Sequence, residues 1–108
     1  MGNLLTTVSS ACASAGANTA VAASAGNHHV LYEFQLQMEA AATSLQRVLL
    51  KSDTTELWRV VGTAVGDGVA HTFPPGQELH WGSGKAIVLD LAEAKSVGYV
   101  LRYRTVAD

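Results

Sequence analysis

Charged side chains are missing from the first third of this 108-residue sequence, since no Asp, Glu, Lys or Arg occurs before Glu33. The whole chain has seven basic and nine acidic residues and a net charge of -2. A protein that binds a polyanion usually presents an excess of positive charge. We therefore expect no nucleic-acid partner, and we expect the N-terminal third to behave differently from the rest.

Cysteine is almost absent as well. Cys12 is the only one, so no disulfide can form within one chain and folding needs no oxidising compartment. No apolar run approaches the roughly 20 residues that cross a bilayer. Residues 1–6 lack the basic region and long apolar block of a secretory signal. These features predict a cytosolic product with no membrane partner.

The N-terminal segment, residues 1–26, is rich in Ala, Ser, Thr and Gly. Alanine favours helix, but Gly16, Gly26 and several β-branched or capping residues interrupt any long one. We expect an extended arm or edge strands here, with residues 4–10 and 19–24 as the strands. Because such a segment cannot form its own core, it could gain order on a neighbouring subunit.

The remaining chain alternates apolar and polar residues, as half-buried strands do. The clearest case is residues 29–39, where Val30, Tyr32, Phe34, Leu36 and Met38 share one face. Further strands are expected at residues 44–51, 56–61, 69–73, 77–81, 85–91 and 97–105. Turn signals separate them, and residues 91–95 are expected to form a wide turn.

Seven or eight short strands at 8 to 12 residue spacing predict an all-β fold. We expect an antiparallel β-sandwich of jelly-roll type over residues 27–108, with the extended N-terminal arm at residues 1–26. No internal repeat is present.

Histidines are the natural place to look for a metal. His28 and His29 are adjacent, so they point to opposite faces of a strand and cannot easily share an ion. His71 and His80 are distant in sequence, and no zinc-binding spacing occurs. We expect all four histidines on the surface or in turns, and no metal site.

Other catalytic patterns are equally weak. The segment Gly82-Ser83-Gly84-Lys85 lacks the upstream glycine and the following Ser or Thr of a phosphate loop, so it is expected to be a hairpin turn. No Gly-x-Ser-x-Gly elbow accompanies any serine, and the acidic residues are scattered near turns. We expect no catalytic residue and no cofactor, so that a small β-sandwich hydrolase is a weak alternative.

Aromatic residues leave two interpretations open. Trp58, Trp81 and the tyrosines could form a sugar-binding platform, because aromatic faces stack on pyranose rings. The competing interpretation is packing in the core or in a subunit interface, which the small size of the other side chains favours.

The layout from Val30 to Thr105 resembles the small jelly-roll modules of bacteriophage virion proteins, including head decoration or cement proteins and some fibre heads. The resemblance lies in the long alternating strand, the segment Ser44–Leu50, the Gly-rich loop, Phe73-Pro74-Pro75-Gly76, Gly84–Leu91 and the closing Gly98–Tyr103. No functional residue is transferred by it.

The resemblance implies a structural protein of the virion that is present in many copies as homotrimers. It would bind the major capsid protein or other virion subunits on the capsid surface, after synthesis in the host cytoplasm. The alternative is a receptor- or glycan-binding fibre or tail module.

Overall fold

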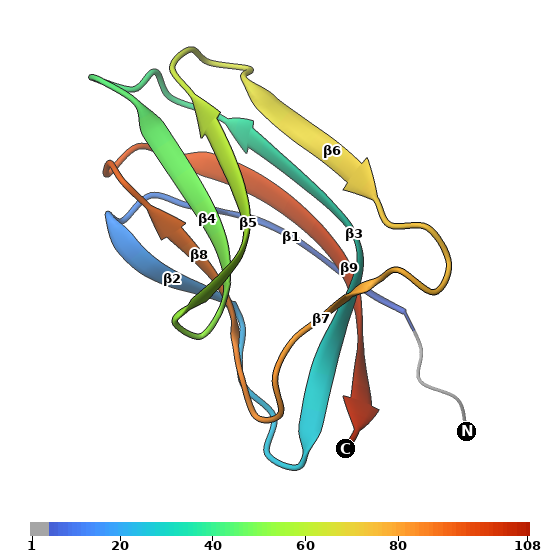
Figure 1. The fold of residues 1–108 in the computed structure, drawn as a ribbon. Helices are drawn as coiled ribbons and strands as arrows, with labels where there is room; N and C mark the ends of the chain where they lie inside the picture. Colours follow the sequence, from blue (N-terminus) through green and yellow to red (C-terminus); the bar gives the residue numbers. More distant parts are fainter. Residues whose placement is uncertain (1–4) are drawn as a thin grey trace.

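The computed structural model describes residues 5–108, which form two antiparallel sheets packed face to face (Figure 1). The all-β sandwich expected from the sequence is confirmed. One sheet has the order β1-β9-β3-β6, with the short β7 also paired to β3, and the other has the order β2-β8-β4-β5. The strands are β1 (Thr6–Cys12), β2 (Gly16–Val21), β3 (Asn27–Met38), β4 (Gln46–Ser52), β5 (Thr55–Gly62), β6 (Gly68–Thr72), β7 (Leu79–His80), β8 (Ile87–Leu91) and β9 (Val97–Ala107).

The pairing of the longer strands is that of a jelly roll. β1 pairs with β9, β2 with β8, β3 with β6 and β4 with β5, so the chain resembles one long hairpin. This hairpin rolls up because β3 also pairs with β9 and β4 with β8. The spacing of strands along the sequence predicted this fold type, and the structure adds which residues pair across neighbouring strands.

The N-terminal segment contributes to both sheets. β1 and β2 are edge strands, each hydrogen-bonded to one neighbour within residues 5–108. Val8, Cys12, Ala20 and Val21 pack partly against the core. The two sheets therefore include residues on both sides of the expected boundary at residue 27. Leu4 of the expected first strand lies outside the described residues.

The core lies between the sheets and is aliphatic with a few aromatic rings. Its residues come from both sheets and alternate along the strands, as half-buried strands require. Along β9 the alternate residues Val97, Tyr99 and Leu101 are all buried. The other members of this cluster include Leu31, Phe34, Leu36, Val48, Leu50, Phe73, Trp81, Ile87, Leu89 and Leu91.

One part of the expected alternation is wrong. The register of β3 against β9 shifts between Leu31 and Glu33, which makes Tyr32 an extra, bulged residue. As a result Leu31, and not Tyr32, joins Phe34 in the core, with none of its surface exposed. Tyr32 is only half-buried, and the Arg104 guanidinium lies 5.1 Å from the centre of its ring.

The turn between β4 and β5 fixes the position of a neighbouring loop. Asp53 has a φ of 52°, a left-handed conformation that Asp tolerates better than most residues. Its Oδ1 accepts a 2.7 Å hydrogen bond from the Ala86 backbone N–H. The expected turn at residues 52–55 therefore also holds the start of β8.

Candidate functional site

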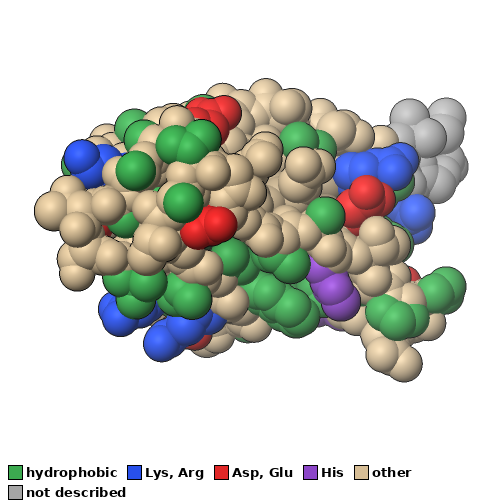
Figure 2. Space-filling model, turned by 90° about the horizontal axis from the view of Figure 1, so that it is seen from above, with side chains coloured by type: hydrophobic (Ala, Val, Ile, Leu, Met, Phe, Trp, Pro, Cys, Tyr) green, Lys and Arg blue, Asp and Glu red, His purple; other side chains and the backbone are tan. Residues whose placement is uncertain are grey.

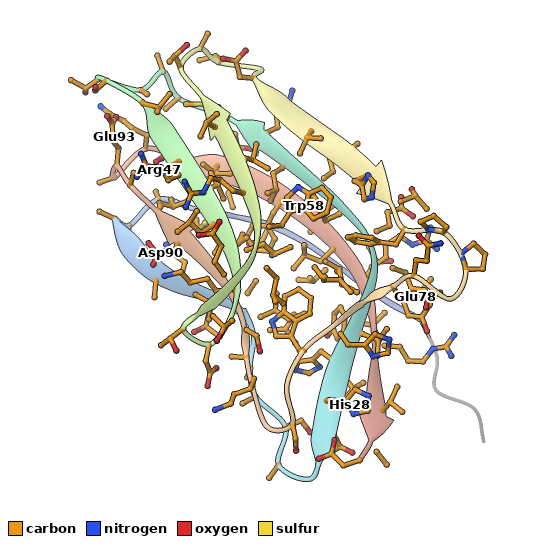
Figure 3. The ribbon with its side chains drawn as sticks, viewed as in Figure 1. His28, Arg47, Trp58, Glu78, Asp90 and Glu93 are labelled. Carbon is orange, nitrogen blue, oxygen red and sulfur yellow. The ribbon has the colours of Figure 1, made fainter. Side chains whose placement is uncertain are left out.

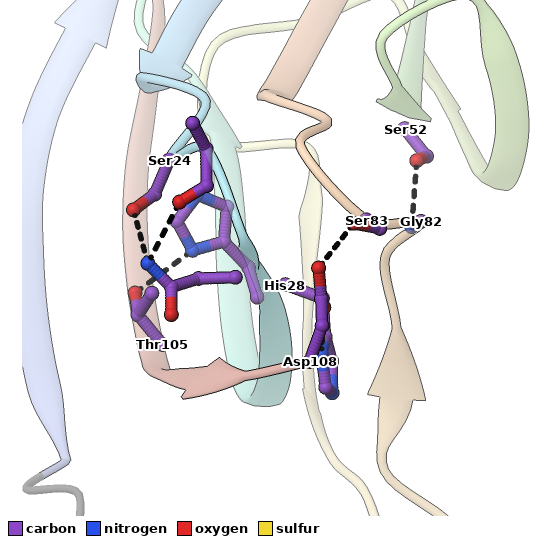
Figure 4. Close-up of polar contacts among 10 residues, drawn as sticks. Ser24, His28, Ser52, Gly82, Ser83, Thr105 and Asp108 are labelled. Atoms are coloured by element: carbon purple, nitrogen blue, oxygen red, sulfur yellow. Dashed lines mark hydrogen bonds and ion pairs between the residues drawn. The ribbon is translucent and has the colours of Figure 1, made fainter.

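A polar cluster lies where the C-terminal residue, Asp108, meets the start of β3 and the loop before β8 (Figure 4). Asp108 accepts a hydrogen bond from the Ser83 hydroxyl, and its Oδ1 is 2.9 Å from Nδ1 of His28. These two contacts hold the pKa of the Asp108 carboxyl below its usual value. The serine is bonded to the carboxylate and not to an imidazole, so the cluster lacks the pairing that activates a nucleophile.

His29 lies inside the sandwich, which corrects the expectation of four surface or turn histidines. Only 2% of its surface is exposed. Its Nε2 is 2.9 Å from the Ala22 carbonyl and its Nδ1 is 2.9 Å from the Thr105 hydroxyl. A neutral ring can donate at Nε2 and accept at Nδ1, so both nitrogens are satisfied. This histidine has a structural role.

Other polar residues within residues 5–108 form separate pairs, such as Lys51 with Asp90 and the stacked rings of His28 and His80. Figure 3 shows His28, Glu78 and Glu93 at three separate places on the fold. Within residues 5–108, no three His, Cys, Asp or Glu side chains group closely enough to hold a metal ion. His71 packs with its ring centre 5.0 Å from that of Trp58, away from the other histidines.

Glu93 has a clear structural role. Its carboxylate accepts hydrogen bonds from the backbone N–H groups of Thr43, Ser44 and Leu45 at 2.8, 2.9 and 3.3 Å. The bonds from Thr43 and Ser44 contribute most to lowering the pKa of this carboxyl. The fully buried Gln46 side chain bonds both the backbone N–H and the carbonyl of Glu93. Together they join the β3–β4 and β8–β9 connections.

Aromatic side chains mostly pack inward. Trp81 is 3% exposed, and its Nε1 donates a 2.8 Å hydrogen bond to the Lys51 carbonyl. Trp58 lies between the two sheets, with its ring centre 5.5 Å from that of Phe34 (Figure 3). Trp81 is therefore a core residue, whereas Trp58 is half-buried and packs against the core.

The segment Gly82–Lys85 borders a depression of about 290 Å³ that is also lined by Asp53, Leu57 and His80. Lys85 Nζ lies 3.8 Å from Asp53 Oδ2, while the other oxygen of that carboxylate bonds Ala86. The opposite charges at its rim thus partly neutralise each other. This arrangement gives the depression no clear preference for an anion or a cation.

The edges of the sheets offer a different kind of site. An edge strand presents unpaired backbone N–H and C=O groups that another chain can bind, and proteins usually protect such edges with charges, prolines, bulges or short length. β5 carries the Glu56–Arg59 ion pair, β2 contains a register shift at residues 19–21, and β6 has five residues and ends before Pro74.

β1 has none of these protective features. It is seven residues long, contains no charge or proline, and follows β9 without a register shift from Thr6 to Cys12. Thr6, Thr7, Ser9, Ser10 and Ala11 are exposed. We therefore take the free edge of β1 as the candidate functional site. The lack of charge in β1 is visible in the sequence. That β1 pairs with a neighbouring strand along only one side is visible only in the structure.

The surface charge agrees with the balanced composition. Figure 2 shows basic and acidic side chains in small interspersed groups on the face in view, without a large region of one sign. Residues 5–108 include no helix with the length and apolarity needed to cross a membrane.

Comparison with known proteins finds a weak structural similarity and no match in sequence. No family model matches the chain, and no curated protein matches it. Among solved structures, it is similar to a chain in the cryo-EM structure of the extra small virus (XSV) virus-like particle of the giant freshwater prawn Macrobrachium rosenbergii. The match has 15% identity, covers 96% of this chain and 80% of the other, and has a TM-score of 0.45. A likeness this weak assigns no function.

Proposed function

We propose that this chain is a structural protein of a virion, and more specifically a decoration protein that binds and stabilises a major-capsid lattice. The observation that carries the proposal is the long, uncharged and unprotected edge strand β1 on a jelly roll. Jelly rolls occur in viral capsid and lectin domains among others, so the fold alone does not select a function. The open edge favours association with other subunits.

In this proposal the chain acts by surface complementarity and needs no cofactor. Backbone groups of an edge strand can add a strand from a neighbouring subunit, which gives affinity without charged side chains. Copies of the chain joined along this edge, and bound to the capsid, would hold adjacent capsid subunits together. The protein would then reside on the capsid surface.

Co-sedimentation tests this function. Capsids assembled from the major capsid protein encoded alongside this chain, but lacking the chain, are mixed with increasing amounts of the purified protein and sedimented. We expect binding to saturate at a fixed number of copies per capsid and to raise the temperature at which the capsids rupture. Capsids that already carry the chain are the control and should bind no more.

Failure to sediment with these capsids at any concentration would contradict the decoration role. A glycan-binding screen of the same preparation would then test the fibre or tail alternative. No feature of the described aromatic residues favours that alternative at present.

A further inference from the structure

The residues of β1 also favour one particular partner for its open edge. We infer that β1 pairs antiparallel with β1 of a second copy of this chain, which joins the two β1-β9-β3-β6 sheets into one continuous sheet. The inference deepens the proposed assembly role and rests on it, because copies bound to one lattice are held close to one another.

The absence of charged side chains on β1 favours a second copy of the chain as its partner. β1 contains no ionisable side chain except Cys12, whose thiol has a pKa raised mainly by burial. Two β1 strands can therefore approach without like-charge repulsion. A neutral edge also offers no charge complementarity to an acidic or basic peptide, which removes one source of selectivity for such partners.

The charges nearest to β1 lie on or over β9, and they include the Glu39 carboxylate, which lies over Gly98 and acts on the Cys12 thiol. Arg102 and Arg104 lie on β9, and Arg102 already contacts Glu33 at 3.2 Å. In the order β9-β1-β1-β9, the two β9 strands are separated by three strand spacings, which is about 14 Å. This exceeds the screening length of about 8 Å at physiological ionic strength.

The side chains of β1 also suit an antiparallel pair. Its exposed residues are small, and hydroxyl-bearing Thr and Ser side chains can hydrogen-bond across paired strands. An antiparallel pair of identical strands is two-fold symmetric, so each copy uses the same surface. A trimer would need a different, head-to-tail interface. Two-fold pairing therefore gives an even number of chains, such as two, or six where trimers pair.

The matched substitutions are Ser9→Lys and Gln35→Lys. Ser9, Val100 and Gln35 lie in one row across β1, β9 and β3, and both substituted residues are exposed. Ser9→Lys places a positive charge at the proposed interface, whereas Gln35→Lys places it two strands away on the same sheet. Thr7→Lys is a second edge variant, used if Ser9→Lys loses the circular dichroism of the folded protein.

Light scattering of the full chain without capsids measures the mass over a concentration series. We expect an even multiple of the 11.3 kDa chain mass, unchanged by Gln35→Lys. Ser9→Lys should raise the dissociation constant about tenfold or more, because like charges on paired strands repel. A mass of one or three chains, or no effect of a folded edge variant, would overturn the inference.

Hydrogen exchange of the wild-type chain provides a test that needs no variant. Those backbone amides of Thr6–Cys12 that point away from β9 should gain protection as the concentration rises through the dimerisation range. Protection that appears only after capsids are added would assign the edge to the capsid protein and overturn self-pairing. Capsid binding by a monomeric chain would leave the proposed function intact, so the two failures are distinguishable.

Discussion

Individual side chains stabilise this fold where backbone groups lack a strand partner. Glu93 is the clearest case, because its carboxylate accepts three backbone N–H groups of residues 43–45. Its charge is favoured in the folded state, so its folded pKa lies below the unfolded value. Its contribution to stability is therefore present above the unfolded pKa and is lost as the pH falls through the folded pKa.

Glu93→Gln tests this contribution. The substitution removes the charge and presents an NH₂ group near backbone donors, so we expect a lower melting temperature at neutral pH. The difference from wild type should shrink as the pH falls through the acidic range in which the Glu93 carboxyl becomes protonated. Thermal unfolding by circular dichroism over a pH series measures both effects.

Glu33→Gln is the control for that experiment. It removes an exposed carboxylate with a single partner, Arg102. Exposed ion pairs contribute about 0–1 kcal/mol, so we expect a smaller change in melting temperature. A difference between Glu93→Gln and wild type that stays constant down to acidic pH would contradict the role assigned to the charge of Glu93.

At the scale of single strands, the sequence predicted most positions and missed local irregularities. Alternation and turn residues located β3, β4, β5 and β9 to within a few residues. The bulge at Tyr32 was not predictable, because tyrosine fits an alternating pattern as well as leucine does. Only the pairing with β9 reveals that one residue is skipped. The buried position of His29 follows from the same shift in register.

The bulge predicts that substitutions at the neighbouring residues Leu31 and Tyr32 differ in their effect on stability. Leu31→Ala should lower the free energy of unfolding by about 2–5 kcal/mol, the usual cost of truncating a buried leucine. Tyr32→Ala should cost about 1 kcal/mol, since Tyr32 is half-buried and its specific contact is with Arg104. Urea denaturation followed by tryptophan fluorescence gives both values. A larger cost for Tyr32→Ala would mean that regular alternation continues through this part of β3.

For the whole molecule, the sequence predicted a jelly-roll sandwich but not which strands pair. Every sheet contact except the β4–β5 hairpin joins strands distant in sequence, and such pairings leave no local pattern. The pairing of β1 could not be predicted from the sequence for the same reason. Small uncharged residues in β1 are compatible with a free arm, whereas its ladder with β9 depends on Val97–Tyr103 at the other end of the chain.

Deleting residues 1–14 tests whether this segment belongs to the fold or only to a partner interface. The deletion removes β1, uncovers β9 and removes the core contacts of Val8 and Cys12. We expect a loss of about 2–4 kcal/mol in unfolding free energy from the lost apolar burial and hydrogen bonds. For a domain of this size, that loss lowers the melting temperature by about 10 °C or more.

Ser9→Lys is the matched comparison for the deletion, because it keeps β1 paired with β9 while blocking its free edge. At concentrations where both proteins are monomeric, we expect its melting temperature to stay close to that of wild type. If the deletion also left the melting temperature unchanged, β1 would contribute nothing to the monomer. Residues 1–14 would then be an arm that gains its order only from a partner, and the jelly roll would be complete without its first strand.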